Sequence, residues 1–162
     1  MKSLLIVMLA AAAISLAADD PGGWSKAKWG MTDAQISEAF GAEAIHLDAP
    51  DENGVRTVVL LDLAGVPCFA EMLPDQTGRL ASVMILPRKV SDMTETLYLA
   101  VKKMLIQKYG PPSKTSETPR ASGVFWTFPT TIIGLVHGAI PPAQNRGLAI
   151  TYGKATPASN PL

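Results

Sequence analysis

The chain has 162 residues, of which 48% are apolar and 17% are charged, and it contains a single cysteine. This composition excludes a disulfide-stapled miniprotein, a coiled coil and a disordered chain, and it leaves a compact domain. The 14 basic and 14 acidic side chains give a formal net charge of zero. Because a phosphate backbone is bound through an excess of positive charge, we do not expect nucleic acid as a partner.

Residues 1–17 have the features of a secretory signal peptide. Lys2 gives a basic start, and the apolar stretch over 4–17, interrupted only by Ser15, ends in small side chains. As a helix, residues 4–18 would reach about 22 Å, which is too short to cross a hydrocarbon core of roughly 30 Å. We therefore predict cleavage after residue 17, a periplasmic or secreted location, and no transmembrane segment in the mature chain.

The first element predicted after this leader is a helix over 32–40. Thr32 and Gln35 match the capping-box pattern, and Gly41 stands where a C-cap glycine is expected. The nearly continuous apolarity of the strand that follows favours a central position in a sheet, and two further strands continue an antiparallel meander. These three strands are predicted at 55–63, 66–73 and 80–86, with a five-residue turn at 74–78.

A second, longer helix is predicted over 92–109. Apolar side chains recur through it at every fourth position, Ser91 and Asp92 are its candidate N-caps, and Gly110 ends it. Three more strands are predicted at 123–128, 131–136 and 148–152.

The predicted order is helix, three strands, helix, three strands. The helices need an apolar surface to cover, and an antiparallel sheet can leave its second face in contact with solvent. We therefore predict an α+β fold of two layers, in which an antiparallel sheet of about six strands carries both helices on one face. Residues 18–153 form this single domain, and residues 154–162 form a flexible C-terminal tail.

The sequence lacks the usual catalytic and metal-binding patterns. His46 and His137 are its only histidines, and no Gly-x-Ser-x-Gly turn is present to expose a nucleophilic serine. Cys68 has no neighbouring base in the sequence, and it lies too far from the cleavage point to carry an N-terminal lipid anchor. We predict no catalytic residue, no metal and no cofactor.

Two tryptophans are the candidate binding residues, since indole side chains are enriched at binding surfaces. Trp24 lies in a segment without apolar periodicity. Trp29 stands where it could staple the first helix, the interpretation that we favour, or cap a groove between helix and sheet. Trp126 alternates with Val124 and Phe128 and is predicted to belong to the core.

Two short motifs resemble those of known exported proteins. Trp29-Gly30-Met31-Thr32, followed by Gln35 and Phe40-Gly41, is similar to the opening of a group of small exported bacterial proteins, mostly uncharacterised. It is also similar to the Gly-Met-Thr start of SmpA/OmlA-type outer-membrane assembly lipoproteins, whose fold resembles β-lactamase inhibitor protein. Lys108-Tyr109-Gly110-Pro111-Pro112, which closes a helix before a strand, is common in such chains. The resemblance implies a helix-and-sheet module of the cell envelope that binds other macromolecules.

We therefore expect an exported, non-enzymatic protein of the bacterial cell envelope. It would bind a protein or an envelope component through its sheet or through the groove beside its helices. One alternative is a carrier of a small apolar ligand, which would need a large closed cavity between the layers. A second alternative is an unrecognised hydrolase, which would need His46 or His137 beside a carboxylate in a cleft.

Overall fold

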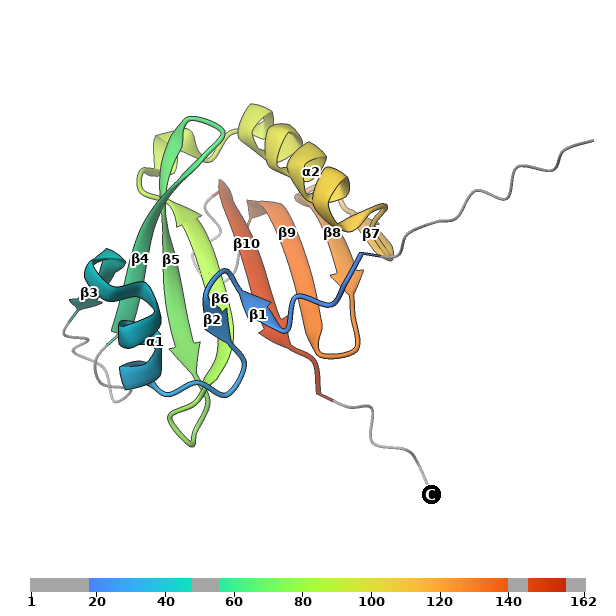
Figure 1. Cartoon of the computed structure of the whole chain (residues 1–162). Coiled ribbons are helices and arrows are strands. Elements are labelled where there is room, and N and C mark those ends of the chain that lie inside the picture. The colour runs from blue at the N-terminus through green and yellow to red at the C-terminus, as the bar shows by residue number, and fades with distance from the viewer. Residues whose placement is uncertain (1–17, 48–55, 140–145, 157–162) are drawn as a thin grey trace, which may run out of the picture.

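A computed structural model describes residues 18–47, 56–139 and 146–156 (Figure 1). The predicted signal peptide and residues 157–162 of the predicted tail lie outside this part of the chain. The helical elements are α1 (Asp33–Phe40), α2 (Glu95–Tyr109) and the 3-10 turns η1 (Gly41–Glu43) and η2 (Val90–Asp92). The strands are β1 (Gly23–Trp24), β2 (Ala27–Lys28), β3 (Ala44–Leu47), β4 (Arg56–Leu63), β5 (Val66–Pro74), β6 (Leu80–Pro87), β7 (Lys114–Glu117), β8 (Ala121–Thr127), β9 (Thr131–Ala139) and β10 (Arg146–Lys154).

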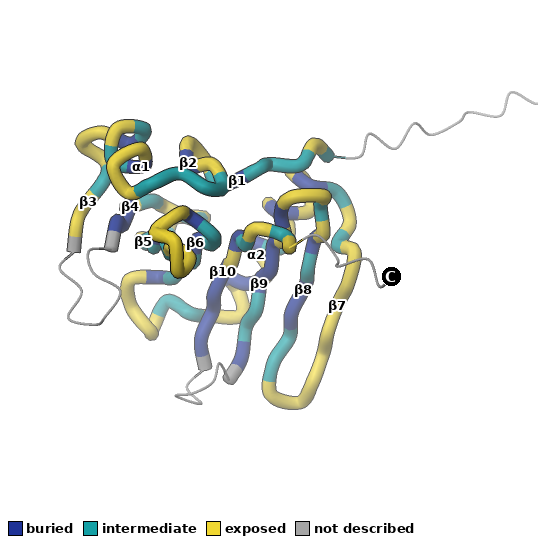
Figure 2. Tube along the Cα trace, turned by 90° about the horizontal axis from the view of Figure 1, so that it is seen from below, coloured by how far each residue is buried: buried dark blue, intermediate teal, exposed yellow. Residues whose placement is uncertain are grey.

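Eight strands form one antiparallel sheet in the order β3-β4-β5-β6-β10-β9-β8-β7, and β1 and β2 form a separate hairpin. The described chain is thus a mixed α+β fold with a large antiparallel sheet, as predicted in outline. The predicted number of about six strands is wrong, because the edge strands β3 and β7 and the β1–β2 hairpin were not expected. β7 has the sequence Lys-Thr-Ser-Glu and is exposed throughout (Figure 2), so it has no apolar alternation that could reveal it.

The sheet consists of two similar halves. In each half one helix precedes a four-stranded meander, α1 before β3 to β6 and α2 before β7 to β10. The halves meet where β6 pairs with β10, over residues 82–85 and 150–153. The last strand of each half therefore lies at the centre of the sheet, and the first strand lies at an edge.

The predicted capping box of α1 is present. The backbone N–H of Gln35 donates to Thr32 Oγ1 at 3.4 Å, and the N–H of Thr32 donates to Gln35 Oε1 at 2.9 Å. These two bonds satisfy N–H groups that have no partner inside the helix, and they fix where the helix begins.

α2 begins at Glu95, three residues later than predicted. The N-cap is Thr94, whose hydroxyl accepts a hydrogen bond from the Leu97 N–H at 3.2 Å. The expected caps Ser91 and Asp92 lie instead in η2, a separate turn before the helix. Thr94 thus replaces both as the start signal, because its side chain reaches the first free N–H groups of the helix.

The core lies between the helices and one face of the sheet. Figure 1 shows α1 and the β1–β2 hairpin in front of that face, where α1 buries Ile36 and Phe40. Trp126 belongs to the core, as its alternation predicts, and its indole N–H donates to the Gly110 carbonyl at 2.8 Å. The strands contribute large, almost fully buried side chains, among them Met72, Leu80, Val83, Ile133, Leu135, Leu148 and Ile150.

Candidate functional site

The face of the sheet turned away from the helices, which we call the open face, is largely apolar. Successive side chains of a strand point to opposite faces, so the strand register identifies the residues on this face. An antiparallel sheet with one solvated face normally carries polar residues there. Here one row across the open face consists of Ile45, Val58, Glu71, Met84, Thr151, Gly134 and Phe125.

A shallow apolar concavity of about 370 Å³ lies on the open face over β3, β4 and β5. Its lining residues are Ile45, Val58, Leu60, Phe69 and Glu71. Leu60 is 50% exposed and Ile45 is 39% exposed, which is unusual for such side chains in a sheet. Four apolar side chains therefore surround one carboxylate at a surface that no helix covers.

The other half of the open face is also apolar, because Phe125 lies across two glycines. A methyl group at Gly134 or at Gly123 would come within 3.2 Å of the Phe125 ring. The ring thus covers strand backbone that bears no side chain of its own. Ile132, which is 42% exposed, and Val136 lie on the same face of β9. Both halves of the sheet consequently present apolar side chains to the outside.

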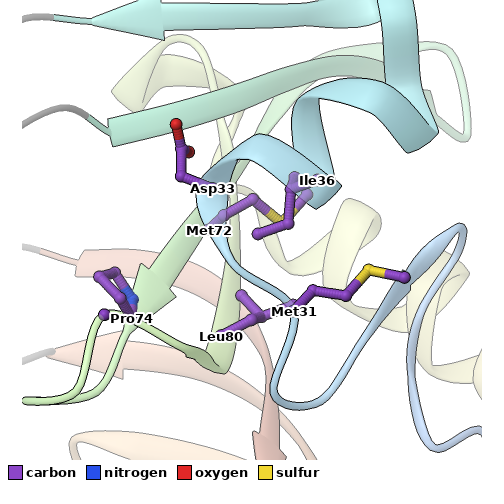
Figure 3. A pocket seen from close by; sticks show the side chains of 7 residues that line it. Met31, Asp33, Ile36, Met72, Pro74 and Leu80 are labelled. Atoms are coloured by element: carbon purple, nitrogen blue, oxygen red, sulfur yellow. The ribbon is translucent and has the colours of Figure 1, made fainter.

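A second pocket, of about 170 Å³, opens beside α1 (Figure 3). Met31, Ile36, Met72 and Leu80 form much of its wall, and Asp33 is its acidic residue. A cavity of about 150 Å³ can hold one benzene-sized group, so this pocket could receive one apolar side chain. It is smaller than the closed cavity that the carrier alternative requires.

A histidine, a carboxylate and two hydroxyls meet where β3 passes the start of α1. His46 Nε2 lies 3.2 Å from Ser37 Oγ, and His46 Nδ1 lies 3.3 Å from Thr57 Oγ1 and 3.8 Å from Asp33 Oδ2. The Thr57 hydroxyl also donates to Asp33 Oδ1. No sequence motif predicted this group, which brings together the residue types that the hydrolase alternative requires.

The Ser37 hydroxyl has a backbone partner besides His46. Ser37 Oγ donates its one proton to the backbone carbonyl of Asp33 at 2.8 Å, the usual bond of a helical serine to the preceding turn. With the serine proton in that bond, Ser37 Oγ accepts from His46 Nε2. The side chains of His46 and Asp33 are 46% and 53% exposed, so solvent reaches both. The arrangement fits a polar tether that holds β3 and β4 to α1.

The two candidate tryptophans are half-buried and pack against the core. Trp24 stacks on Phe40 with ring centroids 6.0 Å apart. The Trp29 indole N–H donates to Thr131 Oγ1 at 2.9 Å, which ties the segment before α1 to β9. Both indoles therefore have partners within the fold. The sequence analysis named these two tryptophans as candidate binding residues. It did not identify the apolar residues of the open face.

Cys68 and His137 have partners inside the molecule. The Cys68 side chain is buried, and burial raises the pKa of its thiol, with a smaller contribution from the negative charges of Asp62 and Asp92. A thiol in this environment is a poor nucleophile. His137 on β9 stacks on Tyr98 of α2, with ring centroids 5.5 Å apart.

The described residues contain neither a cluster of metal ligands nor a membrane-spanning helix. Within 18–47, 56–139 and 146–156, no three His, Cys, Asp or Glu side chains lie close enough to hold a metal ion together. In the same part of the chain, no helix has both the length and the apolar character to cross a membrane.

Comparison with known proteins gives a similar solved structure. No family model matches the chain, and no match was found among curated proteins. The fold is similar to the crystal structure of a DUF4309 family protein, YjgB, from Bacillus subtilis subsp. subtilis str. 168. The TM-score is 0.42 at 11% sequence identity, and the match covers 76% of this chain and 78% of the other.

Proposed function

We propose that this chain is an exported, non-enzymatic binding protein that holds a partner protein of the cell envelope on the open face of its sheet. The observation that supports the proposal most directly is the apolar open face, with Leu60, Ile132 and Ile45 all exposed. A contiguous apolar surface on a soluble domain marks an interaction site more often than it serves stability. The leader over 1–17 supports export.

The shape of the open face favours a protein over a small molecule. Pockets for small ligands bury most of the ligand surface. The concavity around Val58 and Leu60 is shallow and open, so a small molecule would remain largely in water. A partner protein could place one or two side chains in the concavity and cover the flatter surface around Phe125, as anchoring residues do at interfaces.

The first test introduces a charge into the concavity. Leu60→Asp places a carboxylate on an exposed position, so the fold is retained while the apolar contact is lost. Gln76→Asp is the control, because it adds the same charge at an exposed position in the turn between β5 and β6, outside the open face. Chemical crosslinking in envelope extract, followed by mass spectrometry, measures capture by each variant.

We expect the unaltered chain and Gln76→Asp to capture the same protein and Leu60→Asp to reduce its capture by about tenfold or more. Circular dichroism and thermal unfolding check that both variants are folded, and Ile45→Asp is a second variant on the same face. Equal capture by Leu60→Asp, or capture by none of the folded proteins, would contradict the proposal. A lipid or other apolar compound that copurifies and is displaced by Leu60→Asp would favour the carrier alternative.

A further inference from the structure

Helix α2 carries apolar side chains on its outward side as well as on its buried side. Leu99 and Ile106 are 54% and 37% exposed, and Met104, which is 45% exposed, lies at the border of the buried side. Leu99 and Ile106 are seven positions apart, which places them on one line along the helix. The core contact uses a different set, Leu97, Tyr98, Val101, Leu105 and Tyr109. The outward set therefore adds little to the stability of the fold, and a binding role explains it better.

Positive charge accompanies this line of apolar side chains. Lys102 and Lys103 lie between Leu99 and Ile106 in the sequence of α2, and the Lys103 side chain is exposed. Val90, in the turn just before the helix, is 68% exposed. The chain as a whole has no net charge. Residues 88–109 nevertheless hold five basic side chains, Arg88, Lys89, Lys102, Lys103 and Lys108, against the two acids Asp92 and Glu95.

We propose that the outward side of α2 lies on an anionic lipid surface. Apolar side chains flanked by lysines on one helix face are the pattern by which helices lie in the interfacial plane of a membrane. Leu99 and Ile106 would enter the boundary between headgroups and acyl chains. Lys103 would meet the headgroup phosphates, since a lysine can extend its ammonium away from the apolar stem. The ammonium of Lys102 lies 5.9 Å from the Tyr98 ring centroid, and its charge would add to the attraction for the anionic surface.

The shape of α2 favours lipid over an acidic protein as the occupant. The outward side of a helix is convex, and a protein partner would need a groove shaped to fit Leu99 and Ile106. A lipid surface accepts projecting side chains without such a fit, and a helix of 15 residues could lie flat on it over about 22 Å. α2 packs on the core side of the sheet, so lipid binding there leaves the open face free for a partner.

The test is flotation of the protein with lipid vesicles. Residues 18–162 are used, because every described element lies between Gly23 and Lys154 and the apolar leader would itself bind lipid. Vesicles of phosphatidylcholine alone are compared with vesicles that also contain phosphatidylglycerol, each at low and at physiological salt. The variants are Leu99→Ser with Ile106→Ser, and Lys102→Gln with Lys103→Gln. The matched control, Leu60→Ser with Ile132→Ser, alters two exposed apolar residues of the open face.

We expect binding to vesicles with phosphatidylglycerol, weaker binding at higher salt, and a loss of about fivefold or more for each α2 variant. The open-face control should bind as the unaltered protein does. Equal binding to both kinds of vesicle, full binding by either α2 variant, or loss of binding in the open-face control would overturn the proposal. Binding to an acidic protein in place of vesicles would also overturn it. None of these results depends on capture of a protein by the open face. The lipid proposal can therefore fail while the proposed function holds, and the reverse is also possible.

Discussion

Tyr152 is buried beside Tyr109, and the two side chains are hydrogen-bonded. Burial, and then the neighbouring Tyr109, raises the pKa of Tyr152 far above its ordinary value of 10. In the unfolded chain the ordinary value applies. The resulting stabilisation is therefore complete below about pH 10 and is lost as the pH rises toward the pKa of the folded state.

We expect Tyr152→Phe to change the pH dependence of stability. At neutral pH the variant should be less stable by about 1 kcal/mol, because the Tyr109 hydroxyl loses its partner. Above about pH 10 the free energy of unfolding should fall less steeply than in the unaltered protein, because the buried ionisable group is gone. Urea unfolding at a series of pH values measures both effects. Parallel curves for the two proteins would contradict the assignment.

Single residues also show where sequence reasoning reached its limit. Thr32 and Gln35 were identified correctly because a capping box depends on residues three positions apart. The contact between Trp29 and Thr131 spans 102 positions, and no local pattern could predict it. The group around His46 was missed for the same reason, since its members come from α1, β3 and β4 and meet only in the folded chain.

At the scale of single elements, β9 depends on a glycine. Gly138 has φ of 136°, and a Cβ there would lie 2.3 Å from the Arg120 carbonyl oxygen and 2.5 Å from the Ala121 Cα. We expect Gly138→Ala to lower the free energy of unfolding by about 3 kcal/mol, through overpacking and backbone strain. Gly153→Ala in β10 is the control, because its nearest neighbour is 4.0 Å away. Chemical denaturation compares the two. An equal decrease in the free energy of unfolding for both variants would contradict the close packing of Gly138 against β8.

The predicted elements differ from the observed ones for two physical reasons. Edge strands such as β7 bury nothing, so they lack the alternation from which strands are predicted. The second reason concerns the position of β4 in the sheet. Its nearly continuous apolarity indicated a central strand. β4 lies next to the edge, and its second apolar set, which includes Val58 and Leu60, lines the concavity of the open face. Continuous apolarity in β4 therefore arises from one set of residues in the core, which includes Val59, and a second set on the open face, and it does not require a central position.

At the scale of the whole molecule, the two halves of the sheet depend on each other. The segment before α1 reaches into the second half, where the Trp29 indole binds Thr131 and Asp20 accepts the Thr130 N–H. β6 and β10 pair with each other at the centre, so separation would turn both into open edges. The similarity of the halves thus does not make them independent domains.

We expect neither residues 18–92 nor residues 93–162 to fold when they are produced alone. Residues 18–92 lack β10, which pairs with β6 at the centre of the sheet, and residues 93–162 lack β6. The first fragment also lacks α2, which covers part of the core. Near-ultraviolet circular dichroism and dispersion of amide proton shifts measure folding of each fragment, with the joined chain 18–162 as the control. A cooperative unfolding transition in either fragment would contradict this expectation.

The short outer strands limit how the sheet can pair with other copies of the chain. A sheet with one apolar face is at risk of recruiting strands from other copies, and long apolar borders make that growth easy. Here one border is β3, with four residues, and the other is β7, whose Lys114 and Glu117 both face water. Such borders offer little apolar edge for pairing with a strand of a second copy, so the apolar open face does not by itself extend the sheet beyond one molecule.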